Sequence, residues 1–296
     1  MRPRDVALAL AVVLLWGVNF VVIKLGLVGV SPFVLGGLRM LLTAVPAVFL
    51  LPRPRLPFRL YAGFALFSFL GQFTLLFWAI KVGMPSGLAA VVQQSQVFFT
   101  VVLAALVFGE WPRPLQLFGT AVAAAGLFWL AVARGTSFPL AGFVLTLCGA
   151  ASWGVGNLVS RALSRYPVNA LAFVVWSSLL LPVPFFALAW AIEGGEAVRQ
   201  SLAALNGRSW AAIAYLGFGA TIAGFGLWNR LLKAHAAAQV TRFALLVPVV
   251  ALICGRLVFD EQISPAQAGA SGLIVAGIAL PLAAAWWSRI LSPPIS

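Results

Sequence analysis

Long apolar segments run along the whole chain and are separated by short breaks rich in charged residues, proline and glycine. Several segments exceed the roughly 18 apolar residues that indicate a helix crossing a bilayer, and they are too long for the strands of about 10 alternating residues found in outer-membrane barrels. With the breaks as boundaries, the pattern predicts ten membrane-spanning helices. The expected spans are residues 5–28, 32–51, 58–81, 85–108, 114–133, 139–163, 168–190, 209–232, 237–259 and 265–288.

The composition places these helices in lipid. The chain is 62% hydrophobic and 8% charged, with a mean hydropathy of +1.05, whereas ordinary soluble domains are about 25% charged. We therefore predict an all-α polytopic membrane protein. Cys148 and Cys254 lie within apolar runs, where a free cysteine behaves as a small hydrophobic residue. We expect no disulfide framework, no metal site and no cofactor.

The net charge of +13 indicates an orientation in the membrane, and we expect no nucleic-acid partner. Lysine and arginine gather in cytoplasmic loops of membrane proteins. With the N-terminus inside, the inner side holds 11 basic residues and the outer side holds 5, while Lys24, Arg39 and Arg242 fall within spans. Two arginines and an apolar stretch at the N-terminus imitate a secretory signal, but the stretch continues without a small-residue cleavage site and is expected to be the first helix. Both termini are predicted to be cytoplasmic.

An internal repeat accompanies the ten spans. A shift of 151 residues aligns LVFGEWPRPLQ at 106–116 with LVFDEQISPAQ at 257–267, and WGVNF at 16–20 has an echo in WGVGN at 153–157. The chain then consists of two related halves of five helices, 1–135 and 136–296. Because five is odd, the halves cross the membrane in opposite senses, which is an inverted repeat typical of transporters.

The motifs in these halves resemble a known family. WGVNFVVIK in the first helix, the arginine of LGGLRM in the second, and an E-x-x-x-P-x-Q signature after the fourth helix of each half are similar to the EamA-type branch of the drug/metabolite transporter superfamily. More specifically, they resemble its bacterial inner-membrane exporters of amino acids and related metabolites. The resemblance implies ten helices around a central cavity and a protein that functions as a monomer in the inner membrane. Because the family's cargo is diverse, a drug or nucleotide-sugar carrier is the alternative.

Glutamines concentrate near the middle of the fourth predicted helix. Gln93, Gln96 and Thr100 share one face of a continuous helix, at i, i+3 and i+7, and Gln94 lies beside them. Under the 151-residue shift, the stretch QQSQ corresponds to the apolar residues 244–247. The equivalent helix therefore packs without amides, and we predict that these side chains line a substrate cavity. The alternative is that they hold helices together by hydrogen bonds.

Aromatic and amide side chains recur on the first and sixth predicted helices. Trp16, Asn19 and Phe20 share a face of the first helix, and Trp153 and Asn157 occupy the sixth. An aromatic wall with an amide handle suits an amphipathic small molecule, including an aromatic amino acid. The alternative for tryptophan is the interfacial belt of the membrane. Four further candidates carry weaker signals, namely Gln72, Trp78, Trp228 and Asn229.

Two arginines are expected within the membrane. Arg39 lies in the second predicted span and Arg242 in the ninth, and an intramembrane arginine needs a carbonyl, an anion or an aqueous cavity. Either side chain could bind a substrate carboxylate in a bidentate manner. The alternative for each is snorkelling to the membrane surface.

No carboxylate or histidine is expected near the bilayer centre. The six acidic residues lie at helix ends or in loops, and His235 falls in a short connection. Proton-coupled carriers commonly use such groups as relays, so we predict a uniporter driven by the substrate gradient, or an exchanger. The same lack of a general base or metal cluster predicts that the chain is not an enzyme.

Overall fold

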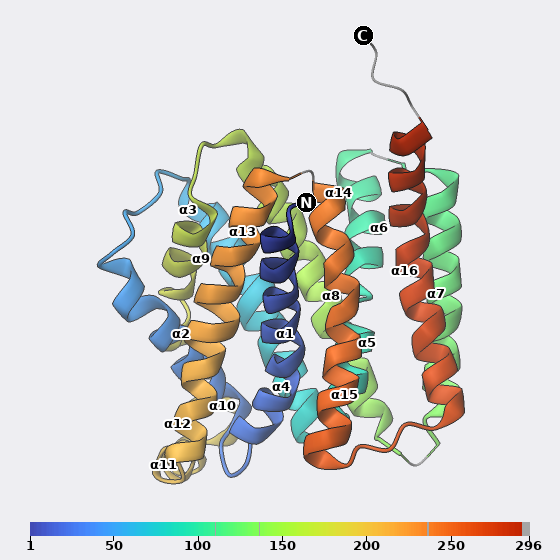
Figure 1. The fold of residues 1–296 in the computed structure, drawn as a ribbon. Coiled ribbons are helices and arrows are strands. Elements are labelled where there is room, and N and C mark those ends of the chain that lie inside the picture. Colours follow the sequence, from blue (N-terminus) through green and yellow to red (C-terminus); the bar gives the residue numbers. More distant parts are fainter. Residues whose placement is uncertain (110, 136, 236, 292–296) are drawn as a thin grey trace.

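The computed structural model describes residues 1–109, 111–135, 137–235 and 237–291. Every regular element within these ranges is a helix, in agreement with the all-α prediction. The helices form a bundle in which α1 (Pro3–Gly26) begins at the same end at which α16 (Pro265–Leu291) ends (Figure 1). The other elements are α2 Pro32–Val48, α3 Phe58–Phe64, η1 Ala65–Gly71, α4 Gln72–Lys81, α5 Ser86–Gln93, α6 Gln96–Phe108, α7 Pro114–Ala133, α8 Leu140–Ala162, η2 Leu163–Arg165, α9 Ala170–Ser178, α10 Pro182–Glu193, α11 Gly195–Ala203, α12 Gly207–Ala214, η3 Tyr215–Ala223, α13 Gly224–Ala234, α14 Ala237–Thr241, η4 Arg242–Leu246 and α15 Val247–Phe259.

In the part of the chain that the structure describes, eight helical segments are long and apolar enough to cross a membrane. Two further apolar helices are shorter, at Pro32–Val48 and Pro265–Pro281. Each of the ten predicted spans overlaps one of these segments, eight of which have the length of a membrane span. Several of the segments consist of two or three consecutive helical elements, such as α3, η1 and α4.

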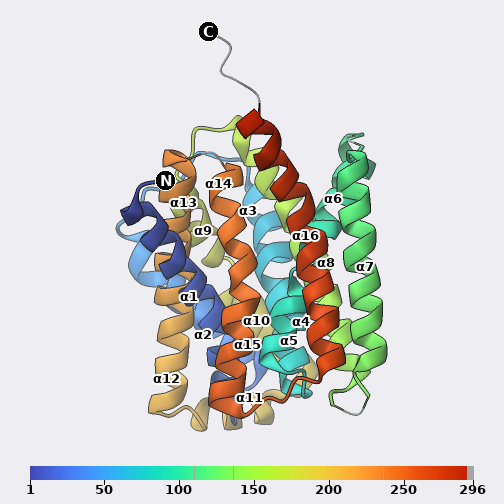
Figure 2. The ribbon, with the colours of Figure 1, turned by 45° about the vertical axis from the view of Figure 1, so that its right-hand side comes forward.

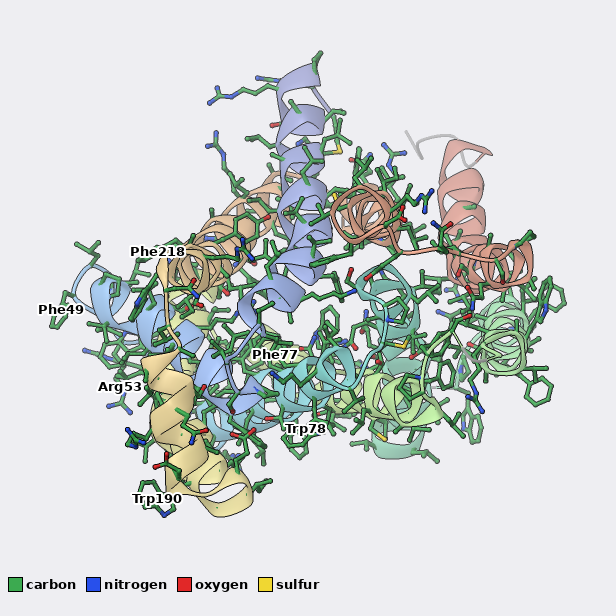
Figure 3. All side chains as sticks on the ribbon, turned by 90° about the horizontal axis from the view of Figure 1, so that it is seen from below. Phe49, Arg53, Phe77, Trp78, Trp190 and Phe218 are labelled. Atoms are coloured by element: carbon green, nitrogen blue, oxygen red, sulfur yellow. The ribbon has the colours of Figure 1, made fainter. Side chains whose placement is uncertain are left out.

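The outside of the bundle is apolar. Phe49, Trp190 and Phe218 are exposed at its periphery, whereas Phe77 is fully buried near the centre (Figure 3). An exposed surface of large apolar side chains is costly in water and suits contact with lipid. The distribution of side chains therefore agrees with a protein embedded in a bilayer.

Two segments have π-helical geometry, which the sequence pattern did not predict. η1 lies between α3 and α4, and η3 lies between α12 and α13. In each, a side chain from a neighbouring helix bonds a backbone carbonyl: the Ser152 hydroxyl donates to Phe67 O at 2.8 Å, and the Trp16 indole N–H donates to Ala220 O at 3.0 Å. π-Helical turns are rare and occur frequently at functional sites.

Two other membrane segments change course near their middle. α5 ends at Gln93, and a turn at Gln94 and Ser95 precedes α6. The 3-10 helix η4 directly precedes α15, where Pro248 occupies the first turn. Proline is tolerated there because a first-turn N–H has no partner within the helix. The Gln94 side chain joins the two irregular regions, since its Nε2 donates to Ala244 O at 3.2 Å.

Helices α7 and α16 pack side by side at one edge of the bundle (Figures 1 and 2). Gly119 and Gly277 face each other, and a Cβ atom on either would collide with the backbone carbonyl of the other. Small residues let transmembrane helices approach this closely. The two helices form one wall of the interior cavity, which Gln116 and Thr120 of α7 and Pro281 of α16 line.

Candidate functional site

A cavity of about 590 Å³ lies between the helices. Its volume falls within the range of about 300–1,000 Å³ that is typical of small-molecule sites. Residues from both halves of the sequence line it, and among the described residues Arg39 is the one lining residue with a charged side chain. The candidate residues that line the cavity are Trp16, Asn19, Phe20, Arg39, Gln72, Gln94, Gln96, Trp153, Asn157 and Trp228.

An amide cluster connects α6 with α8 on one wall. Asn157 Nδ2 donates to Gln96 Oε1 at 2.6 Å and to Thr100 Oγ1 at 2.9 Å, while Thr100 Oγ1 donates to Gln96 O at 2.7 Å. Thr100 is not among the lining residues, but it accepts from the Asn157 amide and donates to the backbone carbonyl of Gln96. The cluster therefore fixes the side chains of Gln96 and Asn157 and leaves amide groups available to a solute.

The glutamines at the break between α5 and α6 differ in position. Gln94 lines the cavity, whereas Gln93 is only 2% exposed and lies away from the cavity wall. Neither the side-chain oxygen nor the nitrogen of Gln93 has a hydrogen-bond partner among the described residues. The single face expected for Gln93, Gln96 and Thr100 assumed an unbroken helix. The turn at Gln94 and Ser95 changes the rotation between them.

Aromatic rings form another wall. Trp16 lies 5.0 Å from Trp228 and 5.5 Å from Phe225, measured between ring centroids. The Trp16 indole is held by its bond to Ala220 O. Its position requires a glycine beside it, since a Cβ atom on Gly224 would lie 2.5 Å from Trp16 Nε1. Offset and tilted rings of this kind offer an apolar surface to an aromatic or aliphatic side chain.

Phenylalanines that the sequence analysis did not select also line the cavity. Phe69 stacks on Phe73 and Phe73 stacks on Phe77, with ring centroids 5.5 Å apart in each pair. The spacing i, i+4, i+8 along one helix was the signal for this stack. This spacing did not predict cavity residues, because an apolar stripe at helical spacing more often belongs to the hydrophobic core than to a binding site. The missed lining residues include Phe64, Ser68, Phe69, Phe73, Phe98, Gln116, Thr120 and Phe225.

The two intramembrane arginines lie in different surroundings. Arg39 is 3% exposed, reaches the cavity, and donates from Nη2 to Thr221 Oγ1 at 3.2 Å. Its guanidinium carbon lies 4.1 Å from the ring centroid of Phe73. Arg242 is exposed at the start of η4 and lies 5.4 Å from the ring of Phe243. Only Arg39 is placed where it can meet a solute in the cavity.

Two weaker candidates lie outside the cavity wall. Trp78 contacts Phe33 edge to face at 5.4 Å between ring centroids and lines a separate pocket of about 460 Å³ with Lys81 and Glu193. Asn229 does not line the cavity, and its Nδ2 is buried without a hydrogen-bond partner in the described part of the chain.

A polar cluster joins the helices at the end of the bundle opposite the start of α1 (Figure 1). The Glu261 carboxylate accepts hydrogen bonds from Lys24 Nζ at 2.7 Å, from Ser86 N and Oγ at 2.8 and 2.9 Å, and from Gly87 N at 3.1 Å. It thereby caps the positive N-terminus of α5 and ties it to α1 and to the connection after α15. Glu110, the corresponding glutamate of the first E-x-x-x-P-x-Q signature, lies outside the described residues.

The environment of Glu261 favours its charged form. Burial raises the pKa of this carboxyl, but the hydrogen bonds from Lys24, Ser86 and Gly87 and the positive charge of Lys24 outweigh burial and lower the pKa below its ordinary value. The side chain is 8% exposed. A buried carboxylate with this many donors is a strong connection between helices.

Comparison with known proteins identifies the family of the chain. The model of the EamA-like transporter family matches residues 4–132 and 140–283. The chain belongs to this family. It is 41% identical over 282 residues to a "Probable amino-acid metabolite efflux pump" of Salmonella typhimurium, with 94% of each chain covered. It is 38% identical over 293 residues to a protein of the same description from Escherichia coli K12, with 98% of each covered.

More distant similarities extend over most of this EamA-like chain. An "Uncharacterized inner membrane transporter YedA" of Escherichia coli is 28% identical over 279 residues, covering 91% of this chain and 88% of the relative. A solved crystal structure of 22% sequence identity superimposes with a TM-score of 0.66 and covers 99% of this chain and 100% of the other. The chain is therefore a multi-pass membrane transporter with the fold of that structure.

Proposed function

We propose that this EamA-like protein exports amino acids, including aromatic ones, and related metabolites across the bacterial inner membrane. The observation that carries the proposal is the cavity of about 590 Å³ whose walls combine tryptophan and phenylalanine rings with amides. Such a lining satisfies both the polar and the apolar parts of an amino acid. The names of the two relatives that are 41% and 38% identical support the same class of cargo.

The proposed architecture is ten membrane helices in two inverted halves, 1–135 and 136–296. Two pairs of irregular elements support it. A shift of 151 residues moves η1 (65–71) onto 216–222, within η3 (215–223), and moves the turn at 94–95 onto 245–246, at the end of η4 (242–246). Irregular geometry at matched positions is expected when two halves share one fold. The proposed functional unit is a monomer, because the cavity lies within one chain.

Alternating access is proposed as the mechanism. The cavity reaches Gln116 and Thr120 in the first turns of α7, and Ser160 near the end of α8, which are the ends nearest the start of α1 (Figure 1). At the opposite end, Glu261 joins α1, α5 and the connection after α15. With both termini in the cytoplasm, the cavity faces inward, and export requires the cluster around Glu261 to separate as the halves rock.

The proposed energy source is the substrate gradient, by uniport or exchange. In the part of the chain that the structure describes, no carboxylate or histidine lines the cavity, so the described wall offers no side chain that commonly relays protons. Counterflow in proteoliposomes measures this directly: an internal amino acid should drive uptake of labelled amino acid without a pH gradient. Uphill accumulation driven by a pH gradient alone would contradict uniport and exchange.

The cargo class is tested by transport with the purified full-length protein. Proteoliposomes should take up labelled phenylalanine and other amino acids above the level of protein-free liposomes. Nucleosides and sugars serve as controls, because their transport in place of amino acids would favour the alternative carriers of the same superfamily.

A further inference from the structure

The guanidinium of Arg39 has hydrogen-bond donors without partners. Nη2 bonds Thr221, but Nε and Nη1 are buried and have no acceptor in the described part of the chain. No ion pair to Arg39 is found among the described residues. A buried charge without a counter-ion is costly, and structures keep one only where an anion, a carbonyl or water completes the site. Arg39 lines the cavity, so a solute bound there can supply an acceptor to the guanidinium.

The structure holds the guanidinium in one place. The Phe73 ring lies 4.1 Å from the guanidinium carbon, Thr221 fixes Nη2, and the Thr43 hydroxyl bonds Arg39 O at 2.9 Å. Thr221 accepts one of the two Nη2 hydrogens. The other hydrogen and the neighbouring unpartnered N–H form a pair of parallel donors on one edge of the guanidinium. This pair matches the two oxygens of a carboxylate.

The apolar wall lies next to these donors. Thr221, which bonds Arg39, and Ala220, whose carbonyl accepts the Trp16 indole N–H, are consecutive residues of the π-helix η3. Arg39 and Trp16 are therefore anchored to one turn of one helix. A ligand bound through a carboxylate at Arg39 would direct its side chain along the rings of Trp16 and Trp228.

We infer that Arg39 is the anion-binding residue of the cavity and that it selects solutes carrying a carboxylate. The inference rests on the proposed export function and deepens it, since it requires of every cargo a carboxylate and makes the amino group secondary. A neutral amide or an amine without a carboxylate leaves the guanidinium without its counter-ion. Such a compound is rejected because of the unpaired buried charge.

The test is competition against labelled L-phenylalanine for binding to the purified full-length protein. The competitors are 3-phenylpropionate, which keeps only the carboxylate, and L-phenylalaninamide and 2-phenylethylamine, which lack it. Unlabelled phenylalanine and 3-phenylpropionate should compete. The other two should bind about tenfold more weakly or worse, as expected for the loss of a hydrogen-bonded charge pair. Equal competition by the acid and the amide would overturn the inference.

Substitutions then assign the selectivity to Arg39. Arg39→Gln should lower affinity for the two carboxylates by about tenfold or more and leave the weak binding of the amide unchanged, thereby removing the discrimination. Arg242→Gln, which removes an arginine outside the cavity, should match the wild type. Discrimination that survives Arg39→Gln would overturn the inference.

Thermal melting reports whether each variant is folded. If Arg39→Gln fails to fold, Arg39→Lys is measured in its place. Lysine keeps the charge but not the paired donors, so this variant should retain part of the discrimination between acid and amide. The competitor series on the wild type also decides the question without any substitution. Failure of the proposed function has a different signature: wild-type protein that neither binds nor transports any amino acid overturns the export function and the inference with it. Binding of phenylalanine without acid-over-amide selectivity overturns only the inference.

Discussion

At the residue scale, the amides around the cavity have unequal roles. Asn157 donates to both Gln96 and Thr100, so the polar wall is a connected cluster in which Gln96 and Asn157 face the interior. Gln93 is as buried as the core but has no partner for its amide in the described part of the chain. A polar group in that position contributes nothing to a solute in the cavity and is costly to bury.

Leucine substitutions distinguish these roles. Gln96→Leu should lower the rate of amino-acid export about fivefold or more, because it removes a cavity amide and one acceptor of Asn157, a loss of about 1 kcal/mol. Gln93→Leu should leave export unchanged and raise the melting temperature, because an apolar side chain of similar size replaces an unpartnered amide. Export rate and thermal melting of both variants check this. The reverse pattern, with export lost only in Gln93→Leu, would contradict the assignment of the cavity wall.

The sequence predicted which residues are candidates for the cavity better than it predicted the direction in which their side chains point. Gln94 and Gln96, with Trp16 and Asn157, were recognisable because amides and tryptophan are unusual in the middle of an apolar span. Their orientation depends on the rotation between consecutive residues, and the turn at Gln94 and Ser95 alters that rotation. In the sequence, Arg39 and Arg242 were likewise equal candidates for binding a substrate carboxylate. Only packing against Phe73 and Thr221 distinguishes Arg39.

At the element scale, the positions of the helices followed from hydropathy, but their internal geometry did not. The segments 65–71 and 215–223 are as apolar as their flanks, and an α-helix would fit the pattern equally well. Their π-helical turns have carbonyls that bond Ser152 and Trp16 from other helices. Because these donors are distant in sequence, local propensity carries no information about them.

The Glu261 carboxylate makes a testable connection between elements. Glu261→Gln should lower the free energy of unfolding by about 2 kcal/mol, because it removes a charged acceptor from Lys24, Ser86 and Gly87. Asp260→Asn is the matched control. Asp260 is exposed and pairs with exposed Arg256, and asparagine tolerates its positive φ of 54°. Equal melting temperatures for Glu261→Gln and the wild type would contradict the role of the cluster.

The pH dependence of this difference has a definite sign. The pKa of Glu261 in the folded protein is lower than its ordinary value of 4.5. The stabilisation is therefore fully present above 4.5 and is lost as the pH falls through the lower folded-state pKa. The difference in melting temperature between the wild type and Glu261→Gln should stay constant from neutral pH down to about 4.5 and shrink as the pH falls further. A difference that already disappears near neutral pH would contradict the lowered pKa.

At the scale of the whole molecule, the two ends of the bundle differ: a polar cluster joins the helices at one end, and the cavity extends toward the other. The cluster of Glu261, Lys24 and Ser86 and the helix α11 lie at the end opposite the start of α1 and the end of α16 (Figure 1). The bias of basic residues, 11 against 5, predicts that the termini are cytoplasmic. The cavity then faces the compartment from which an exporter collects its substrate.

Cysteine labelling tests this orientation. In a Cys148→Ala and Cys254→Ala background, Pro52→Cys places a thiol in the exposed connection between α2 and α3, and Gln200→Cys places one on exposed α11. Neither change alters a charge, so the bias of basic residues is preserved. A membrane-impermeant maleimide should label Gln200→Cys in intact spheroplasts and label Pro52→Cys only after lysis. Labelling of Pro52→Cys in intact cells would reverse the orientation. The cavity would then face outward, and the cluster around Glu261 would be the cytoplasmic closure.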